Sequence, residues 1–163
     1  MKMISCLTLA LALLLAVAPV FAEPYIDNAD VTVTDQATGL IWQQSDDGVT
    51  RRWQDALDYC SALTLTGKSD WRLPTIKELF SIVDVTRTNP ATNPIFAVSD
   101  AANGEYWSST TNRLYYMTAA SVDIYDGTFY RQNKSNSSPY TRCVRSNDTL
   151  ISQEGSPDYG NGS

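Results

Sequence analysis

The chain has 163 residues, a formal net charge of −6 and no histidine. This length allows one domain of ordinary size, and the lack of histidine excludes His-dependent catalytic triads and imidazole metal centres. The pI near 4.5 argues against a nucleic-acid partner, because such binding needs clustered positive charge.

The first 22 residues have the pattern of a signal peptide. Lys2 precedes an almost wholly apolar run over 4–21, and residues 20–22 (VFA) match a small-x-small cleavage site. The alternative is a membrane-spanning helix, but the run is barely long enough to cross a bilayer. We expect cleavage after Ala22, a secreted or periplasmic product, and no membrane insertion of the mature chain.

Two cysteines, Cys60 and Cys143, remain in the mature chain, residues 23–163. In an oxidising compartment an even pair predicts one disulfide. Two separate buried thiols are the alternative. A bridge between these positions would stabilise the fold by about 4 kcal/mol in the chain-entropy treatment.

The mature chain opens with the pattern of a β-hairpin. Residues 30–34 (DVTVT) alternate between apolar and polar, as a half-buried strand does, and residues 40–42 (LIW) form a second short strand. Gly39, in the turn between them, can adopt a left-handed backbone conformation.

Apolar residues at helical spacing then predict two helices, over 50–65 and 76–83. Cys60 lies on the apolar stripe of the first helix, so we expect it to face the core. Thr75 and Glu78 have the spacing of a capping box, in which each side chain bonds a free amide at the start of the second helix.

A long loop at 84–104 precedes the segments with strand patterns. We expect these segments to form an antiparallel meander of four strands, at 105–110, 114–124, 128–132 and 140–146. The residues expected on the better-buried face of the second of them are Tyr116, Thr118, Ala120, Val122 and Ile124. Residues 147–163 lack an apolar pattern and are expected to be a flexible tail. This order of elements predicts an α+β domain over 23–146.

Five motifs follow one another through this domain: DQATGLIW at 35–42, WQDALDYC at 53–60, DWRLPTIKEL at 70–79, YWSST at 106–110 and RCVR at 142–145. Together they resemble the Lcl C-terminal domain family, named after the terminal domain of a bacterial collagen-like adhesin. The resemblance implies a C-type-lectin-like fold and a bacterial source. In such folds a disulfide commonly joins the first helix to the last strand, where Cys60 and Cys143 stand.

The resemblance implies less about activity than about fold. The RLPT segment is similar to formylglycine-generating enzymes, but their chemistry needs a reactive cysteine pair near the chain end, and Cys143 stands alone there. The sugar-binding motifs of calcium-dependent lectins are missing. The adhesin domain implies binding of sulfated polysaccharides and a trimer formed through a collagen stalk, yet this chain has no Gly-x-y repeat.

The candidate binding residues are tyrosines and basic side chains of the predicted meander, a combination common on recognition surfaces. They are Arg113, Tyr115, Tyr116, Tyr125, Tyr130, Arg131 and Lys134. Cross-strand packing of tyrosine with long basic side chains is the alternative interpretation. Structural roles in the core, the helix cap and loop contacts are expected for Trp71, Arg72, Pro74, Thr75, Glu78 and Trp107. We predict no catalytic residue, cofactor or metal site, and interpret the oxygen-rich 84–105 loop as solvated rather than as a calcium site.

These observations predict an exported, non-enzymatic recognition or adhesion module that binds a glycan or protein partner. One alternative is a carboxylate-dependent glycan hydrolase, which needs two acidic side chains facing each other across about 5–10 Å. Another is a structural subunit of an envelope assembly, with the tail after residue 146 as its contact.

Overall fold

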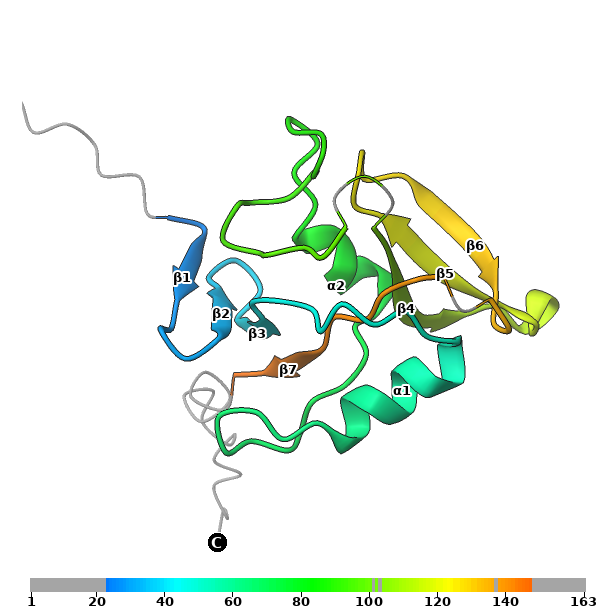
Figure 1. The fold of residues 1–163 in the computed structure, drawn as a ribbon, viewed down its shortest axis with the longest axis horizontal. Coiled ribbons are helices and arrows are strands. Elements are labelled where there is room, and N and C mark those ends of the chain that lie inside the picture. The colour runs from blue at the N-terminus through cyan, green and yellow to red at the C-terminus, as the bar shows by residue number, and fades with distance from the viewer. Residues whose placement is uncertain (1–22, 101, 103, 137, 148–163) are drawn as a thin grey trace, which may run out of the picture.

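The structure, a computed structural model, describes residues 23–147 except 101, 103 and 137 (Figure 1). The expected signal peptide and the tail from residue 148 onward lie outside the described residues. Its strands are β1 (Tyr25–Asp27), β2 (Thr32–Asp35), β3 (Leu40–Gln43), β4 (Glu105–Thr111), β5 (Thr118–Asp123), β6 (Phe129–Asn133) and β7 (Val144–Ser146). Its helices are α1 (Trp53–Ala62), α2 (Ile76–Ser81) and the short 3-10 helix η1 (Arg113–Tyr115). The α+β prediction is confirmed. Within this part of the chain, we find no helix with the length and apolar character needed to span a bilayer.

The predicted hairpin is confirmed as β2 and β3, which pair Val33 with Trp42 in a sheet of order β1-β2-β3-β7. The strand β1 was not predicted, and the predicted position of the last strand is wrong. Instead of joining the meander, β7 pairs with β3, with Trp42 opposite Val144. Both of these side chains are fully buried, and Arg72 exchanges two backbone hydrogen bonds of 2.9 Å with Val144. The apolar contact with the hairpin therefore determines where the last strand lies.

The second sheet has the order β4-β5-β6 and is the meander that the sequence predicted, without its last strand. The strand expected from residue 114 starts only at Thr118, because residues 113–115 form η1, and Tyr116 is 72% exposed rather than buried. The expected alternation along this strand is also wrong. Ala119 and Ser121 are as buried as Ala120, since both faces of β5 are covered.

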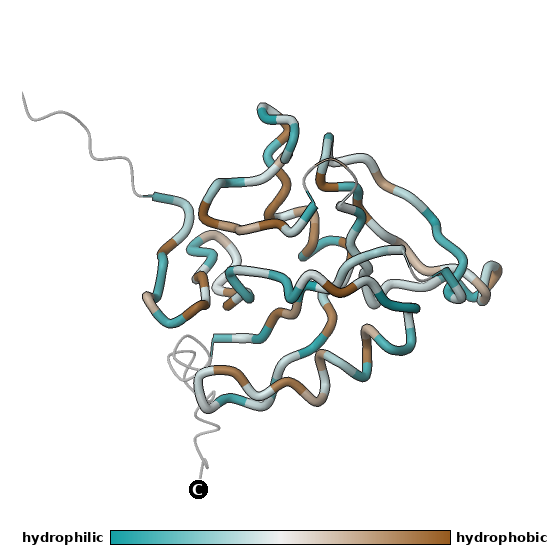
Figure 2. The backbone as a smooth tube through the Cα atoms, viewed as in Figure 1, coloured by the Kyte–Doolittle hydropathy of each residue, from teal (hydrophilic) through white to brown (hydrophobic). Residues whose placement is uncertain are grey.

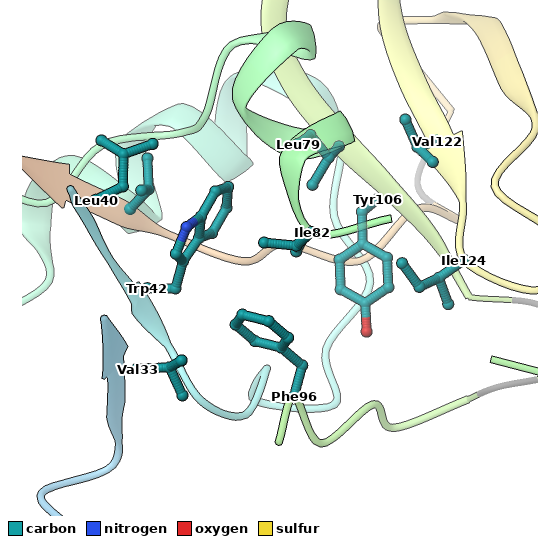
Figure 3. Close-up of a cluster of buried hydrophobic side chains, with 10 residues drawn as sticks. Val33, Leu40, Trp42, Leu79, Ile82, Phe96, Tyr106, Val122 and Ile124 are labelled. Atoms are coloured by element: carbon teal, nitrogen blue, oxygen red, sulfur yellow. The ribbon is translucent and has the colours of Figure 1, made fainter. Parts of the chain in front are cut away.

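The core consists of two apolar clusters, and β4 contributes to both. Tyr106 belongs to the cluster drawn in Figure 3, where side chains from β2, β3, α2 and β5 face one another. Trp107, the next residue, packs with α1 in the other cluster. The predicted disulfide lies in that second cluster: Cys60 and Cys143 are bonded, with their Cα atoms 5.5 Å apart, and both are fully buried. It ties α1 to the residue directly before β7.

Both helices are shorter than predicted. The first begins at Trp53 because Arg52 has an extended backbone, and it ends before Leu63, which is extended as well. The predicted capping box is confirmed at α2. The Thr75 hydroxyl accepts a bond of 3.3 Å from the Glu78 amide, and the Glu78 carboxylate accepts one of 2.7 Å from the Thr75 amide. Local hydrogen bonding thus sets the start of α2.

Candidate functional site

The connection between β4 and β5 carries four consecutive apolar side chains that face solvent. Leu114 is 84% exposed, Tyr115 59%, Tyr116 72% and Met117 53%. Figure 1 shows this connection projecting at the end of the molecule beyond β5, and Figure 2 shows apolar residues there beside hydrophilic ones. Single exposed apolar residues are ordinary on protein surfaces, but a contiguous group marks a candidate interaction site.

A groove of about 240 Å³ lies next to this connection. Its lining comes from the start of α2 and from all three strands of the second sheet: Ile76, Thr110, Thr111, Asn112, Thr118, Ala119, Ala120, Phe129 and Arg131. The Arg131 guanidinium lies 5.2 Å from the centre of the Tyr115 ring, a cation–π contact that links the groove to the projecting connection. We call Arg113, Leu114, Tyr115, Tyr116, Met117, Phe129 and Arg131 the aromatic–basic surface.

The structure brings together only part of the predicted binding set. Arg113, Tyr115, Tyr116 and Arg131 belong to the aromatic–basic surface. Tyr130 points to the opposite face of the sheet from Arg131, because neighbouring residues in a strand alternate. Tyr125 follows β5 at the far end of the hairpin, and Lys134 lies 4.1 Å from the Trp53 ring on α1.

The charged residues of the strands and connections that carry the aromatic–basic surface are almost all basic. Residues 106–122 contain Arg113 and no acidic residue, and residues 128–147 contain four basic residues and no acidic one. The nearest carboxylates in these strands, Glu105 and Asp123, stand opposite each other at the start of β4, away from the connection to β5. An acidic chain thus presents a locally basic, aromatic end.

A buried charge network that was not predicted joins β3 to two segments that follow it in the chain. Asp46 lies in the loop that follows β3, yet its side chain is 1% exposed and lies 3.5 Å from the Arg142 guanidinium. Arg142 also donates to the carbonyls of Gln43, Gln44 and Ala97 at 2.6–2.8 Å. These bonds join β3, the long loop and the segment before β7. The available signal in the sequence was the position of Arg142 directly before Cys143 in the RCVR motif.

Hydrogen bonds keep the Asp46 carboxylate charged in this network. Burial alone would raise its pKa, but donation by Ser99, Tyr106 and the Gly48 amide outweighs burial, and the pKa lies below 3.8. The Tyr106 hydroxyl donates to Asp46 over 2.5 Å, and burial together with this contact raises the tyrosine pKa. The network is saturated with internal partners, so its role is to hold the fold.

The residues expected to have structural roles lie in the core and around the start of α2. Trp71 is 3% exposed, Trp107 is fully buried, and Pro74 is buried. Arg72 binds a carboxylate, because its guanidinium donates two bonds of 2.8 and 2.6 Å to Glu78. The RLPT segment therefore links the capping box to the core.

Residues 31–145 match the Lcl C-terminal domain. This range is most of the chain, and it runs from the residue before β2 into β7. The chain belongs to the Lcl C-terminal domain family. Comparison with curated proteins finds no match. The stretch shared with the family includes the disulfide, both apolar clusters, the Asp46–Arg142 network and the aromatic–basic surface.

No described groove of this Lcl C-terminal domain is lined by two acidic side chains. Glu105 has a pKa raised by burial, although Ser121 and Gln132 donate to it at 2.5 and 3.0 Å. The described grooves hold at most one carboxylate each, Asp30 in one and Asp58 in another. Among the residues that the structure describes, no three acidic or cysteine side chains gather as a metal site would require.

Proposed function

We propose that this Lcl C-terminal domain is an exported, non-enzymatic recognition module that binds a glycan or protein partner through its aromatic–basic surface. The single observation that carries the proposal is the run of four exposed apolar side chains, Leu114 to Met117, beside Arg131 and a groove. Tyrosine and arginine are the side chains most enriched at binding hot spots, because each combines a large apolar area with hydrogen-bonding groups.

Two further features support the proposal. The signal-peptide pattern and the disulfide suit a secreted or periplasmic protein of the bacterial envelope. The link from α1 to the segment before the last strand suits a C-type-lectin-like scaffold, which is the fold that we propose. Such a covalently tied core can present a projecting connection without losing its shape.

The test uses the mature chain, residues 23–163, on glycan arrays and in pull-downs from envelope extracts, with hydrolysis of the same glycans measured in parallel. We expect a specific glycan or protein to be retained by the wild type and lost by the Tyr115→Ala/Tyr116→Ala double variant. The matched control is Val85→Ala, because Val85 is 85% exposed but lies on the long loop after α2. Binding that survives the double variant, or glycan turnover without stable binding, would overturn the proposal.

A further inference from the structure

The outer edge of β6 is open. The second sheet ends with β6, which pairs only with β5, and four of its five residues are exposed. The other outer edge of this sheet is covered, since β4 exchanges backbone bonds with Tyr140 and the Ser109 amide donates to Pro74. In the first sheet, β7 is likewise bonded on its outer side to Arg72.

The register shows which backbone groups of β6 face outward. The Asp123 amide donates to Thr128 over 2.8 Å, and the Lys134 amide donates to Met117 over 2.9 Å. The five pairs of β5 and β6 run without a bulge. Because backbone groups point to alternate sides along a strand, even-numbered residues of β6 bond β5, and Phe129 and Arg131 direct their amides and carbonyls away from it.

These outward groups are free to bind. Within the described part of the chain, no hydrogen bond engages the amides or carbonyls of Phe129 and Arg131. Proline and bulges are common devices that protect an edge strand, and β6 has neither. An added strand could therefore extend the ladder at Phe129 and Arg131 with regular backbone bonds, up to Asn133, whose carbonyl already accepts from the Asn136 amide.

The side chains beside this edge specify the chemistry of the added strand. Phe129 and Arg131 stand opposite Val122 and Ala120 in the register, so both point to the face that holds the groove. A residue paired with Arg131 would project its side chain onto the same face. The guanidinium there favours a carboxylate, and the Phe129 ring two positions away favours an apolar side chain.

We propose that β6 accepts an extended acidic segment of a partner protein as a fourth strand, with a carboxylate opposite Arg131 and an apolar side chain opposite Phe129. This inference rests on the proposed function and narrows its partner from a glycan or protein to a peptide segment. A glycan has no alternating amides and carbonyls to match the edge. A second copy would bring two sets of Arg113, Arg131 and Lys134 together, and like charges disfavour that pairing.

The test probe is a phage-displayed library of random linear dodecapeptides, selected on the mature chain. We expect the enriched sequences to be acidic and rich in strand-forming residues, and their synthetic peptides to protect residues 128–134 from hydrogen exchange. The edge-blocking variant is Arg131→Pro, which removes an outward amide and leaves the ladder to β5 intact. It should weaken binding about tenfold or more, and Arg131→Glu should select against acidic peptides.

Modified peptides keep the test decisive if Arg131→Pro folds poorly. N-methyl groups at every second residue of a bound peptide should abolish binding when they lie on the residues whose amides face β6. They should be tolerated when they lie on the residues in between, and only strand addition predicts this alternation. Strand addition is refuted if no peptide is enriched. It is also refuted if binding is unaffected both by Arg131→Pro and by the position of the N-methyl groups. The glycan-array and pull-down test separates the two proposals. If the Tyr115→Ala/Tyr116→Ala variant loses the partner and Arg131→Pro keeps it, strand addition is refuted and the proposed function stands.

Discussion

Removing the disulfide should cost a large share of the stability of this domain. Cys60 and Cys143 are separated by 83 positions in the sequence. For a loop of this length, restriction of the unfolded chain is worth about 4.5 kcal/mol at 25 °C. Domains of this size are stable by roughly 5–15 kcal/mol in total. The Cys60→Ala/Cys143→Ala variant is therefore expected to fold only marginally.

The assay is urea unfolding of the mature chain, followed by the fluorescence of its four tryptophans. Wild type in reducing buffer is the matched control, because it loses the bond but keeps both sulfur atoms in the core. We expect both samples to lose about 4.5 kcal/mol of unfolding free energy. A loss below about 1 kcal/mol, or free thiols in the purified protein by mass spectrometry, would refute the reasoning.

Three further predictions concern the polar interactions of the core and the helix cap. Arg142→Met should lower the unfolding free energy by about 3–5 kcal/mol, because it leaves the Asp46 carboxylate buried without its cation; a urea midpoint equal to wild type would contradict this. Thr75→Ala should cost about 1 kcal/mol in thermal unfolding through loss of the cap, and an unchanged Tm would show that the cap is dispensable. Burial raises the pKa values of Asp46 and Glu78, but hydrogen bonds, including the one from Arg72 to Glu78, outweigh burial. The folded-state pKa values therefore lie below the usual values of 3.8 and 4.5. The stability they contribute is complete above those values and is lost as the pH falls through the folded-state pKa values. Unfolding free energy measured from about pH 6 to pH 3 should therefore decrease, and a flat profile would contradict the assignment.

The elements with local signals were predictable from the sequence. The capping box depends on Thr75 and Glu78, three positions apart, and the β2–β3 hairpin depends on a short alternating pattern. The Cys60–Cys143 bond was predictable because residues 23–163 contain only these two cysteines. Each of these inferences needs no knowledge of distant contacts.

Features that depend on distant packing were not predictable. Asp46 stands in a polar loop, and only the approach of Arg142 makes it a core residue. Tyr116 matched a strand pattern, but the chain turns at η1 and leaves it exposed. The binding set was divided for a similar reason, since Tyr125 and Tyr115 lie at opposite ends of one hairpin. Sequence proximity identified the hairpin as the candidate region but did not show which of its ends carries the groove.

The pairing of β3 with β7 also bears on how the protein is made. The first sheet cannot be completed until the final strand has left the ribosome, because Trp42 needs Val144 to cover it. The nascent chain thus lacks a finished core until residue 144 has emerged, and contacts between such distant segments form slowly. Under the export that we propose, a chain whose core is still unfinished could thread through a narrow translocation channel, and closure of the disulfide on the far side would then make folding difficult to reverse.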